Sequence, residues 1–453
     1  MSLPKHSTYR NHDSKWLGSL PSHWDGKALK HVVSMIESGV SVNSVDEPAT
    51  ENKFGVLKTS CVYSGHFNPK ENKTVIAGEI NRLACPVKAK TLIVSRMNTP
   101  ALVGAAGLVE ADEENLFLPD RLWQVHFKDA LPKLVHYWTT SPAYRAQVEM
   151  ACEGTSSSMQ NLSQDNFLRF VLPLPPYSEQ NTIAAFLDHE TAKIDALIAE
   201  QEKLIALLAE KRQATISHAV TRGLNPEVPM KDSGVAWLGE VPTHWIVQSI
   251  KHIVATPITD GPHETPNFPE EGIPFVSAEA VSGGYIDFKK IRGYISIEDH
   301  YRYSTKYKPQ IHDIFMVKSG ATTGVTAIVE TDTDFNIWSP LAVIRCDKQK
   351  ADPYFVLAAL RSRNFQEGVA LNWSFGTQQN IGMGVLGDLP IALPPLIEQK
   401  NITNALAKEL PKHNQICYEA EHAILLLKER RSALIAAAVT GQIDVRTFVA
   451  EAS

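Results

Sequence analysis

Two kinds of hydrophobic pattern alternate along the chain. In the first, which lasts about 150 residues, short apolar runs such as "KTLIVSR" and "RLWQVHF" are separated by Gly, Pro, Asn and Asp, a pattern typical of short β-strands joined by turns. In the second, from Ser178 to about Val220, proline and glycine are absent and apolar residues recur at heptad spacing. This pattern predicts a long helix with Ser178 as its N-cap, ended by Thr221-Arg222-Gly223.

A second long helix is predicted from about Glu398 to Val439, with Ile416, Ala420 and Ile424 on its apolar stripe. Pro411 is expected to break or kink it near its start, because proline lacks the amide hydrogen that a helix interior needs. Neither helix can bury its stripe alone. Because the first leads from one β-rich region to the next and the second leads back, we expect the two to pack antiparallel.

The whole arrangement occurs twice. "WLGSLPSHW" at 16–24 returns as "WLGEVPTHW" at 237–245, and "LPLPPYSEQNTIAAFL" at 172–187 returns as "IALPPLIEQKNITNAL" at 391–406. The chain is therefore a tandem duplication. The predicted fold class is α+β, with two β-rich domains joined by two long antiparallel helices in a pseudo-two-fold repeat. The expected segments are a first domain at 1–177, a helix at 178–222, a second domain at 223–397, a helix at 398–445 and a tail at 446–453.

Composition limits the classes of function. The net charge is −6 over 453 residues, and neither β-rich region has the basic excess that non-specific DNA affinity requires. A DNA-binding role would thus need partners that supply phosphate contacts. The five scattered cysteines predict reduced thiols and no metal site. No apolar run is long enough to cross a bilayer, and we expect a cytoplasmic protein.

One motif invites a catalytic interpretation. Pro175-Pro176-Tyr177 resembles the end of the D/N/S-P-P-Y/F tetrad of amino-methyltransferases, in which the first residue accepts a hydrogen bond from the target amine. That position is Leu174 here and Leu393 in the second copy, and neither can accept one. Walker-type and glycine-rich cofactor loops are also missing from the sequence. We therefore expect no catalytic residue, and we interpret the prolines as a rigid connection between a strand and a helix. His23 and His244, each before a tryptophan, are expected to pack or to cap.

The repeated order of "WLG..P..HW", β-rich region, "LPxPPxxEQ" and long helix resembles the specificity subunit of type I restriction–modification systems, over nearly the whole chain. The resemblance implies that each β-rich domain is a target recognition domain for one half of a bipartite, asymmetric site in double-stranded DNA. It implies that the helices set the gap and bind two modification subunits, which methylate adenine N6. Restriction subunits, the ATP-driven motor and nuclease, would join the larger complex. S-adenosylmethionine, ATP and Mg²⁺ would then be carried by these partners, with no cofactor in this chain.

Candidate base-reading residues are polar side chains where predicted strands run into loops, because Arg, Lys, Asn and Gln supply the usual contacts to base edges. In the first copy they are Lys58, Thr59, Ser60, Arg96, Asn98, Ser156, Ser157, Ser158 and Gln160. In the second copy they are Ser277, Glu279, Lys318, Thr322, Thr377, Gln378, Gln379 and Asn380. The two sets differ in chemistry, so we expect the half-sites to differ.

The helices carry more apolar surface than one partner helix can cover, which predicts a docked protein. The residues expected to serve it are Ile194, Leu197, Leu204, Leu208, Ile216, Ile424, Leu427 and Leu434. Two alternatives remain. A repeat scaffold that binds only proteins would show no DNA sequence preference, and a self-sufficient methyltransferase would methylate DNA without partners.

Overall fold

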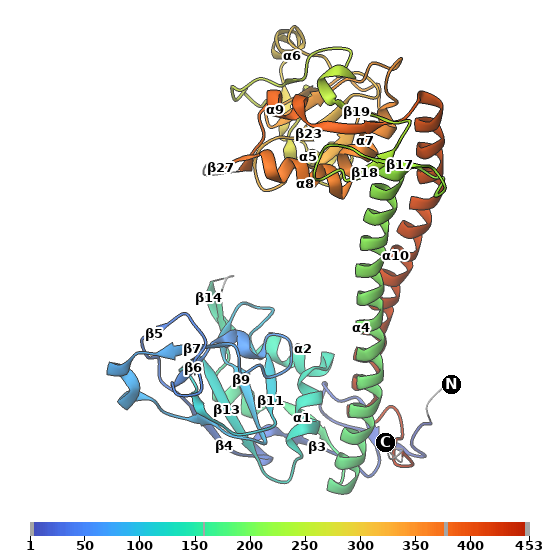
Figure 1. The fold of residues 1–453 in the computed structure, drawn as a ribbon. Helices are drawn as coiled ribbons and strands as arrows, with labels where there is room; N and C mark the ends of the chain where they lie inside the picture. The colour runs from blue at the N-terminus through green and yellow to red at the C-terminus, as the bar shows by residue number, and fades with distance from the viewer. Residues whose placement is uncertain (1–3, 157–158, 376–378, 449–453) are drawn as a thin grey trace. The chain divides into compact units, whose positions relative to one another are not determined.

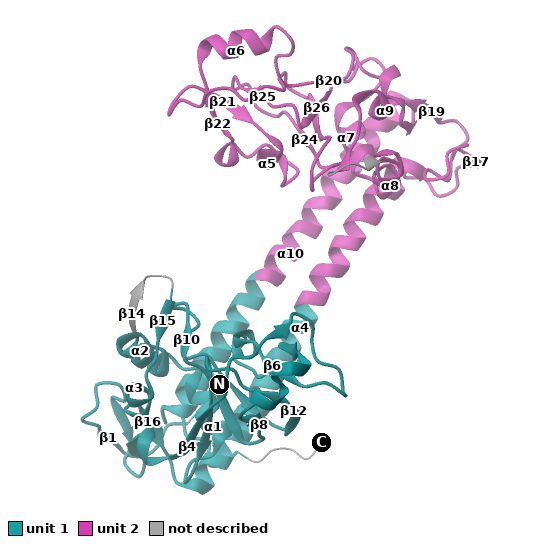
Figure 2. Cartoon of the chain, turned by 90° about the vertical axis from the view of Figure 1, so that its left-hand side faces the viewer, with its two compact units in different colours: residues 1–201, 422–453 teal, residues 202–421 magenta. Residues whose placement is uncertain are grey.

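A computed structural model describes residues 4–156, 159–375 and 379–448, with the backbone alone for 153–156 and 374–375. The chain divides into two compact units (Figure 2). Unit 1 comprises Met1–Gln201 and His422–Ser453, and unit 2 comprises Glu202–Glu421. Each unit therefore contains one β-rich domain and a section of each long helix.

The centre of unit 1 is a four-stranded antiparallel sheet with the order β11-β9-β13-β4 (Figure 1). Strand β9 (Thr91–Ser95) is buried at every position, as its β-branched and aliphatic residues predict for an interior strand. It lies between β11 (Ala106–Val109) and β13 (Leu122–Phe127), and β13 pairs with β4 (Val33–Ser38). Tryptophans from separate segments, Trp24, Trp123 and Trp138, fill the core beside this sheet.

Smaller sheets and three helices surround this centre. Helices α1 and α2 both begin with proline, whose missing amide hydrogen costs nothing at a helix start. The helices are α1 (Pro132–Thr139), α2 (Pro142–Ala151) and α3 (Gln164–Leu168). The paired strands are β1 (Tyr9–Asn11) with β2 (Ser19–Pro21) and β3 (Asp25–Ala28) with β16 (Val171–Leu174). The sheet β5-β7-β6-β12-β8 comprises Ser44–Val45, Asn72–Val75, Gly55–Leu57, Glu113–Phe117 and Pro86–Val87, and the sheet β10-β15-β14 comprises Met97–Asn98, Met159–Asn161 and Glu153–Ser156.

Unit 2 repeats this topology. Its four-stranded sheet has the order β24-β23-β26-β20, which matches β11-β9-β13-β4 strand for strand in sequence order. The parallel pairing of β6 with β12 also returns, as the parallel pairing of β21 with β25. The strands are β17 (Met230–Asp232), β18 (Glu240–Pro242), β19 (Ile246–Ser249), β20 (Thr259–Asp260), β21 (Ile273–Val276), β22 (Gly293–Ile295), β23 (Ile314–Val317), β24 (Thr326–Ile328), β25 (Asn336–Ile337), β26 (Leu341–Ile344), β27 (Ser374–Phe375), β28 (Gln379–Asn380) and β29 (Pro390–Leu393). The short helices are α5 (Ala278–Val281), α6 (Ile297–Ser304), α7 (Pro353–Arg361), α8 (Arg363–Asn372) and α9 (Met383–Asp388).

The two long helices are α4 (Tyr177–Arg222) and α10 (Leu396–Val439), and α4 packs against α10 (Figure 1). The prediction that Ser178 caps α4 is wrong, because the chain is already helical at Tyr177. The carbonyl of Pro176 accepts the first helical bonds, from the amides of Glu179 at 2.9 Å and Gln180 at 3.0 Å. The predicted stop is confirmed, since Gly223 follows the last helical residue with φ of +76°, a conformation that glycine adopts easily.

Pro411 does not break α10. The helix is continuous across it, and the proline side chain is exposed. Pro411 removes one backbone hydrogen bond, but the helix is held on both sides by residues on its packed face, among them Leu406 and Ala420, which are both buried. Tertiary packing therefore outweighs the local preference of one residue.

The packed faces of α4 and α10 follow the heptad pattern. On α4 the buried or half-buried positions recur at alternating steps of four and three: 187, 191, 194, 198, 201, 205 and 208. Within unit 1, the guanidinium of Arg431 on α10 lies 3.0 Å from the carboxylate of Asp195 on α4, which fixes the antiparallel register there. None of the described helices combines the length and the hydropathy that a bilayer span requires.

Candidate nucleic-acid interface

In unit 1, strand pairing brings three predicted base-reading positions together. Strand β9 leads through Arg96 into β10, and β10 pairs with β15 so that Asn98 lies opposite Gln160. The amide of Leu162 also donates a hydrogen bond to the carbonyl of Arg96 at 2.8 Å. The strand that follows the end of β9 therefore lies beside the β14–β15 hairpin (Figure 2). A two-stranded β-ribbon of this kind fits the major groove of B-DNA.

Tyr63, which the sequence did not single out, joins these strands to a third predicted segment. Its hydroxyl lies 2.8 Å from Oγ1 of Thr59 and accepts a hydrogen bond from Nδ2 of Asn98 at 2.8 Å. Asn98 also donates to Ser95 and is buried, so in this conformation it positions Tyr63 and does not face solvent. Tyr63 itself is 39% exposed and presents an aromatic ring and a hydroxyl at the surface.

The remaining described candidates of the first copy have local partners. The ammonium of Lys58 lies 2.9 Å from the carboxylate of Asp46, and the hydroxyl of Ser60 donates to Glu71. The guanidinium of Arg96 lies over the ring of Trp123, 6.0 Å from its centroid. Ser157 and Ser158 lie outside the described residues, as does the side chain of Ser156.

Unit 2 repeats the arrangement with other side chains. Lys318 follows β23, and its carbonyl accepts a hydrogen bond from the amide of Ile381 at 2.8 Å, as that of Arg96 does from Leu162. The next residue, Ser319, forms a β-bridge with Asn380. Lys318 and Arg96 therefore occupy equivalent places at the end of a central strand beside a hairpin.

The side chain of Lys318 points into unit 2 and pairs with a buried carboxylate. Its ammonium lies 3.0 Å from one carboxylate oxygen of Asp260, and the ammonium of Lys306 lies 2.6 Å from the other. Asp260 is fully buried. Burial by itself would raise the pKa of Asp260, but the hydrogen bonds and charges of Lys306 and Lys318 outweigh it and hold the pKa below its ordinary value. Lys318 therefore stabilises the carboxylate of Asp260 in this structure, and its ammonium group is not free to contact a base.

The other candidates of the second copy are more dispersed. Ser277 is buried in front of α5, and Glu279 is exposed within α5, at the end of β21 in a different sheet from β23. Thr322 is half-buried in the turn after β23, and Gln379 is exposed in β28. Asn380 is exposed beside it. Thr377 and Gln378 lie outside the described residues.

The methyltransferase-like tetrad has no catalytic geometry. Leu174 is the last residue of β16, is buried, and pairs with Asp25 in the β3–β16 ladder. Leu393 has the same place in β29, opposite Ile246. Tyr177, which would stack on a base, begins α4 and is 58% exposed. The proline pair therefore joins a strand to a helix, as the sequence predicted.

The repeated motifs bind each other. Trp24 Nε1 donates to Glu179 Oε1 at 3.1 Å, and His23 Nε2 lies 2.9 Å from Glu179 Oε2. We name this three-residue contact the His-Trp-Glu clip. It recurs in unit 2, where His244 and Trp245 bind Glu398 at 2.8 and 3.2 Å.

The neighbouring glutamines complete the connection. The carbonyl oxygen of Gln180 accepts from the amide of Leu131 at 2.7 Å, and its amide donates to Pro175 at 3.0 Å. Gln399 binds the amide of Asp352 and the carbonyl of Pro394 in the same way. The sequence located both motifs, but it could not show that they are partners.

The eight residues predicted to dock a protein separate by burial. Ile194, Leu208, Ile216 and Ile424 are buried within the chain, and Leu427 and Leu434 are half-buried. These side chains hold the helices to their surroundings, so they offer little or no surface to a partner. Of the eight, Leu197 and Leu204 are exposed, by 51% and 36%. Further exposed leucines that the sequence did not single out are Leu207, Leu425 and Leu426.

Comparisons with known proteins agree with this architecture. Residues 21–206 match the family model described as type I restriction modification DNA specificity domain. The chain is 23% identical to the type I restriction enzyme EcoBI specificity subunit of Escherichia coli, over 74% of this chain and 70% of that one. It is 22% identical to the EcoKI specificity subunit of Escherichia coli strain K12, over 69% and 66%.

Solved structures extend the agreement to the fold. A chain solved in work on complex assembly and conformational transition of the type I R-M system superposes with a TM-score of 0.69, at 18% identity, over 93% of this chain and 98% of that one. The HsdS subunit from Thermoanaerobacter tengcongensis gives a TM-score of 0.50 at 16% identity, over 93% and 98%. In its duplicated domains, its paired long helices and the family match over residues 21–206, the chain is similar to the specificity subunits of type I restriction–modification systems.

Proposed function

We propose that the chain is the DNA-recognition subunit of a type I restriction–modification complex and that each β-rich domain contacts one half of a bipartite, asymmetric target. The observation that carries this proposal is the arrangement of strand end and hairpin that occurs in both units. Arg96 and Gln160 in the first copy correspond to Lys318 and Gln379 in the second. The glutamines are the same in both copies, but the strand-end side chains differ: Arg96 lies over the ring of Trp123, whereas Lys318 is paired with Asp260. Because of this difference, the two half-sites are expected to differ in sequence.

The chain is proposed to act without catalysis of its own. Leu174 and Leu393 stand where a methyltransferase needs a hydrogen-bond acceptor, and both are buried in strands. Two modification subunits would bring S-adenosylmethionine and methylate adenine N6. Restriction subunits would bring the ATP- and Mg²⁺-dependent functions. A subunit of such a complex works where the genomic DNA is, so the cytoplasm remains its expected location.

The long helices are proposed to space the domains and to dock the modification subunits. Docking by burial of apolar surface needs side chains that the chain leaves uncovered. In unit 1 these are Leu197 on α4 with Leu425 and Leu426 on α10. In unit 2 they are Leu204 and Leu207 on α4 with Ile416 on α10. Partners bound there would also supply the phosphate contacts that a chain with a net charge of −6 lacks.

A domain exchange tests the proposal. Residues 33–162 are replaced by the equivalent segment of another specificity subunit, which leaves the β3–β16 ladder and the His-Trp-Glu clip in place. The hybrid is expressed with the modification subunits, and the methylated sites in the host genome are sequenced. One half of the methylated sequence is expected to change while the other half and the gap stay the same. A change in both halves, or in neither, would contradict the proposal.

The same preparation separates the two alternatives. If the chain is a protein-only scaffold, exchanging residues 33–162 should not change which DNA sequences are methylated. A self-sufficient methyltransferase predicts that the purified chain transfers methyl groups to DNA when the modification subunits are absent.

A further inference from the structure

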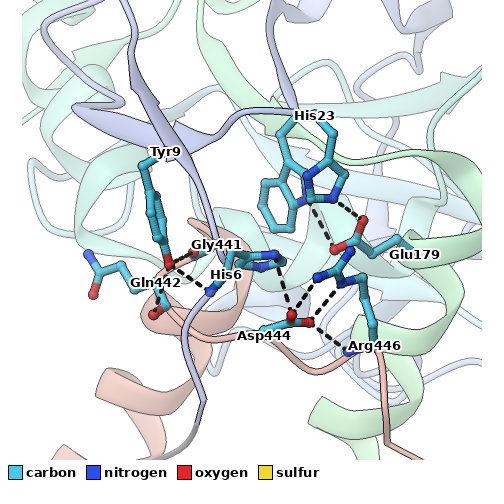
Figure 3. Close-up of polar contacts among 9 residues, drawn as sticks. His6, Tyr9, His23, Glu179, Gly441, Gln442, Asp444 and Arg446 are labelled. Carbon is cyan, nitrogen blue, oxygen red and sulfur yellow. Dashed lines mark hydrogen bonds and ion pairs between the residues drawn. The ribbon is translucent and has the colours of Figure 1, made fainter.

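Three side chains from distant parts of unit 1 meet beside the first turn of α4 (Figure 3). His6 comes from the segment before β1, His23 from the loop between β2 and β3, and Glu179 from the helix. One nitrogen or oxygen atom of each lies within 4.8 Å of the others. Two imidazoles and a carboxylate are a common ligand set for Zn²⁺.

His6 lies beside the His-Trp-Glu clip, but its imidazole takes part in none of the hydrogen bonds of the clip. Its side chain is 2% exposed, and neither ring nitrogen has a hydrogen-bond partner among the described residues. Its ring packs on those of His23 and Trp24, at centroid distances of 5.5 and 5.7 Å. A buried imidazole without a hydrogen bond costs on the order of 1–3 kcal/mol, so a missing ligand is expected at one of its nitrogens.

The surroundings favour a cation. Glu179 is oriented by Trp24, which donates to its other oxygen at 3.1 Å, as groups behind metal ligands commonly do. The carboxylate of Asp444 lies 3.8 Å from Nδ1 of His6 and is paired with Arg446. The carboxylates of Glu179 and Asp444 outnumber the single guanidinium of Arg446, which leaves the site negative.

We propose that His6, His23 and Glu179 bind a Zn²⁺ ion that ties the N-terminal segment to the start of α4, with water as the fourth ligand. Metal–ligand bonds of about 2.0–2.2 Å place ligand atoms about 3.3–3.6 Å apart in a tetrahedral site. The His23 and Glu179 atoms, now 2.9 Å apart, would therefore separate slightly, and His6 would move toward them. This inference does not depend on the proposed DNA-recognition role.

The second copy provides an internal control. His244, Trp245 and Glu398 repeat the clip with nearly the same distances. His6 lies three residues before Tyr9 in β1, and the residue three before Met230 in the matching β17 is Glu227, which is exposed. Unit 2 therefore has the clip without the buried third ligand, and it is expected to bind no zinc at this place.

Three of the five cysteines are poor competitors for the metal. Burial raises the pKa of the Cys61, Cys85 and Cys346 thiols to about 12, so these thiols stay protonated at neutral pH. A thiol binds Zn²⁺ as the thiolate.

The test uses the full chain without a polyhistidine tag, freed of metal with a chelator and titrated with Zn²⁺ against a chromophoric chelator. One Zn²⁺ per chain is expected. His6→Gln and His23→Gln should each weaken binding at least tenfold, and His244→Gln should leave it unchanged. Co²⁺ bound to the wild-type protein should give the visible absorption of a tetrahedral site, and His6→Gln should remove it.

His6→Gln leaves the clip intact, so its folding can be verified by circular dichroism before titration. Zinc should also raise the thermal midpoint of the wild-type protein but not that of His6→Gln. The proposal is overturned if the wild-type chain binds no Zn²⁺ at micromolar concentration. It is equally overturned if binding survives His6→Gln in a folded protein.

Discussion

The indole of Trp24 donates a hydrogen bond to the carboxylate of Glu179 across 3.1 Å, and these two residues are 155 positions apart in the sequence. Trp245 and Glu398 make the same bond in the second unit, at 3.2 Å. Both tryptophans are almost fully buried, so each carboxylate satisfies an indole that water cannot reach. This relationship explains why the "HW" and "PPxxEQ" motifs occur together in each copy. The "HW" motif lies near the start of the β-rich domain and the "PPxxEQ" motif lies at the start of the long helix that follows it. The hydrogen bond between them holds these two segments together.

The clip should stabilise each unit measurably. Glu398→Ala leaves the indole of Trp245 and the imidazole of His244 without their acceptor, and the buried indole should cost about 1–3 kcal/mol. Unit 2 is the better place to measure this because no metal is proposed there. Hydrogen exchange of the β19–β29 amides reports the loss, since the two units need not unfold together. Glu202→Ala, on an exposed position of α4, is the matched control. Equal protection in both variants would show that the clip contributes nothing.

The buried carboxylate of Asp260 should make unit 2 sensitive to acid. Its pKa is lowered in the folded state, so it contributes stability above the unfolded pKa of about 3.9, and this contribution is lost as pH falls through the folded value. Stability of unit 2 should therefore decline below about pH 4. Asp260→Asn should weaken unit 2 at neutral pH, because Lys306 and Lys318 lose their counter-charge, and should flatten the decline in acid. Urea denaturation at several pH values measures both effects, with the exposed Asp332→Asn as control.

The sequence predicted the features that repeat. The motifs that recur in the same order predicted the duplication, and the apolar residues at heptad spacing predicted the long helices. Gly223 predicted the end of the first helix. The sequence did not distinguish neighbouring positions within a heptad. Leu197 and Leu204 fit the apolar stripe, yet they lie one residue from Ile198 and Ile205, which occupy the packed face. A shift of one residue turns a side chain by about 100° around the helix, which is enough to move it from the packed face to solvent.

Pairings between distant residues could not be predicted from one sequence. Lys318 and Asn98 were predicted to contact bases. The structure shows that Lys318 pairs with Asp260 and that Asn98 donates a hydrogen bond to Tyr63. His6 belonged to no recognisable motif, because its neighbours His23 and Glu179 are 17 and 173 residues away in the sequence. Such contacts depend on tertiary packing, which cannot be predicted from hydrophobic periodicity or local propensity.

Equivalent hairpin residues should affect different half-sites. Gln160 lies opposite Asn98 in unit 1, and Gln379 has the corresponding place in unit 2. A glutamine that contacts a base edge contributes about 1–3 kcal/mol of discrimination, so Gln160→Ala should relax one base position in one half-site by roughly 5- to 150-fold. Gln379→Ala should relax a position in the other half-site. Methylation of a library of target variants by the assembled complex measures both, and relaxation of the same half-site by both variants would contradict the two-domain proposal.

Lengthening the helices should lengthen the gap between the half-sites. The Asp195–Arg431 contact places Gln201 of α4 opposite a residue close to Ile424 of α10, so four residues inserted after each position extend both helices at the same level. Four residues add about 6 Å of helix, which corresponds to one or two base pairs at about 3.4 Å each. The bases recognised should stay the same, because neither β-rich domain is altered. The control replaces the four residues after each position with the inserted sequence at constant length, and it should keep the original gap. Sequencing of methylated sites in cells that express each variant decides the matter, and an unchanged gap in a stable, active insertion variant would rule out the spacer role.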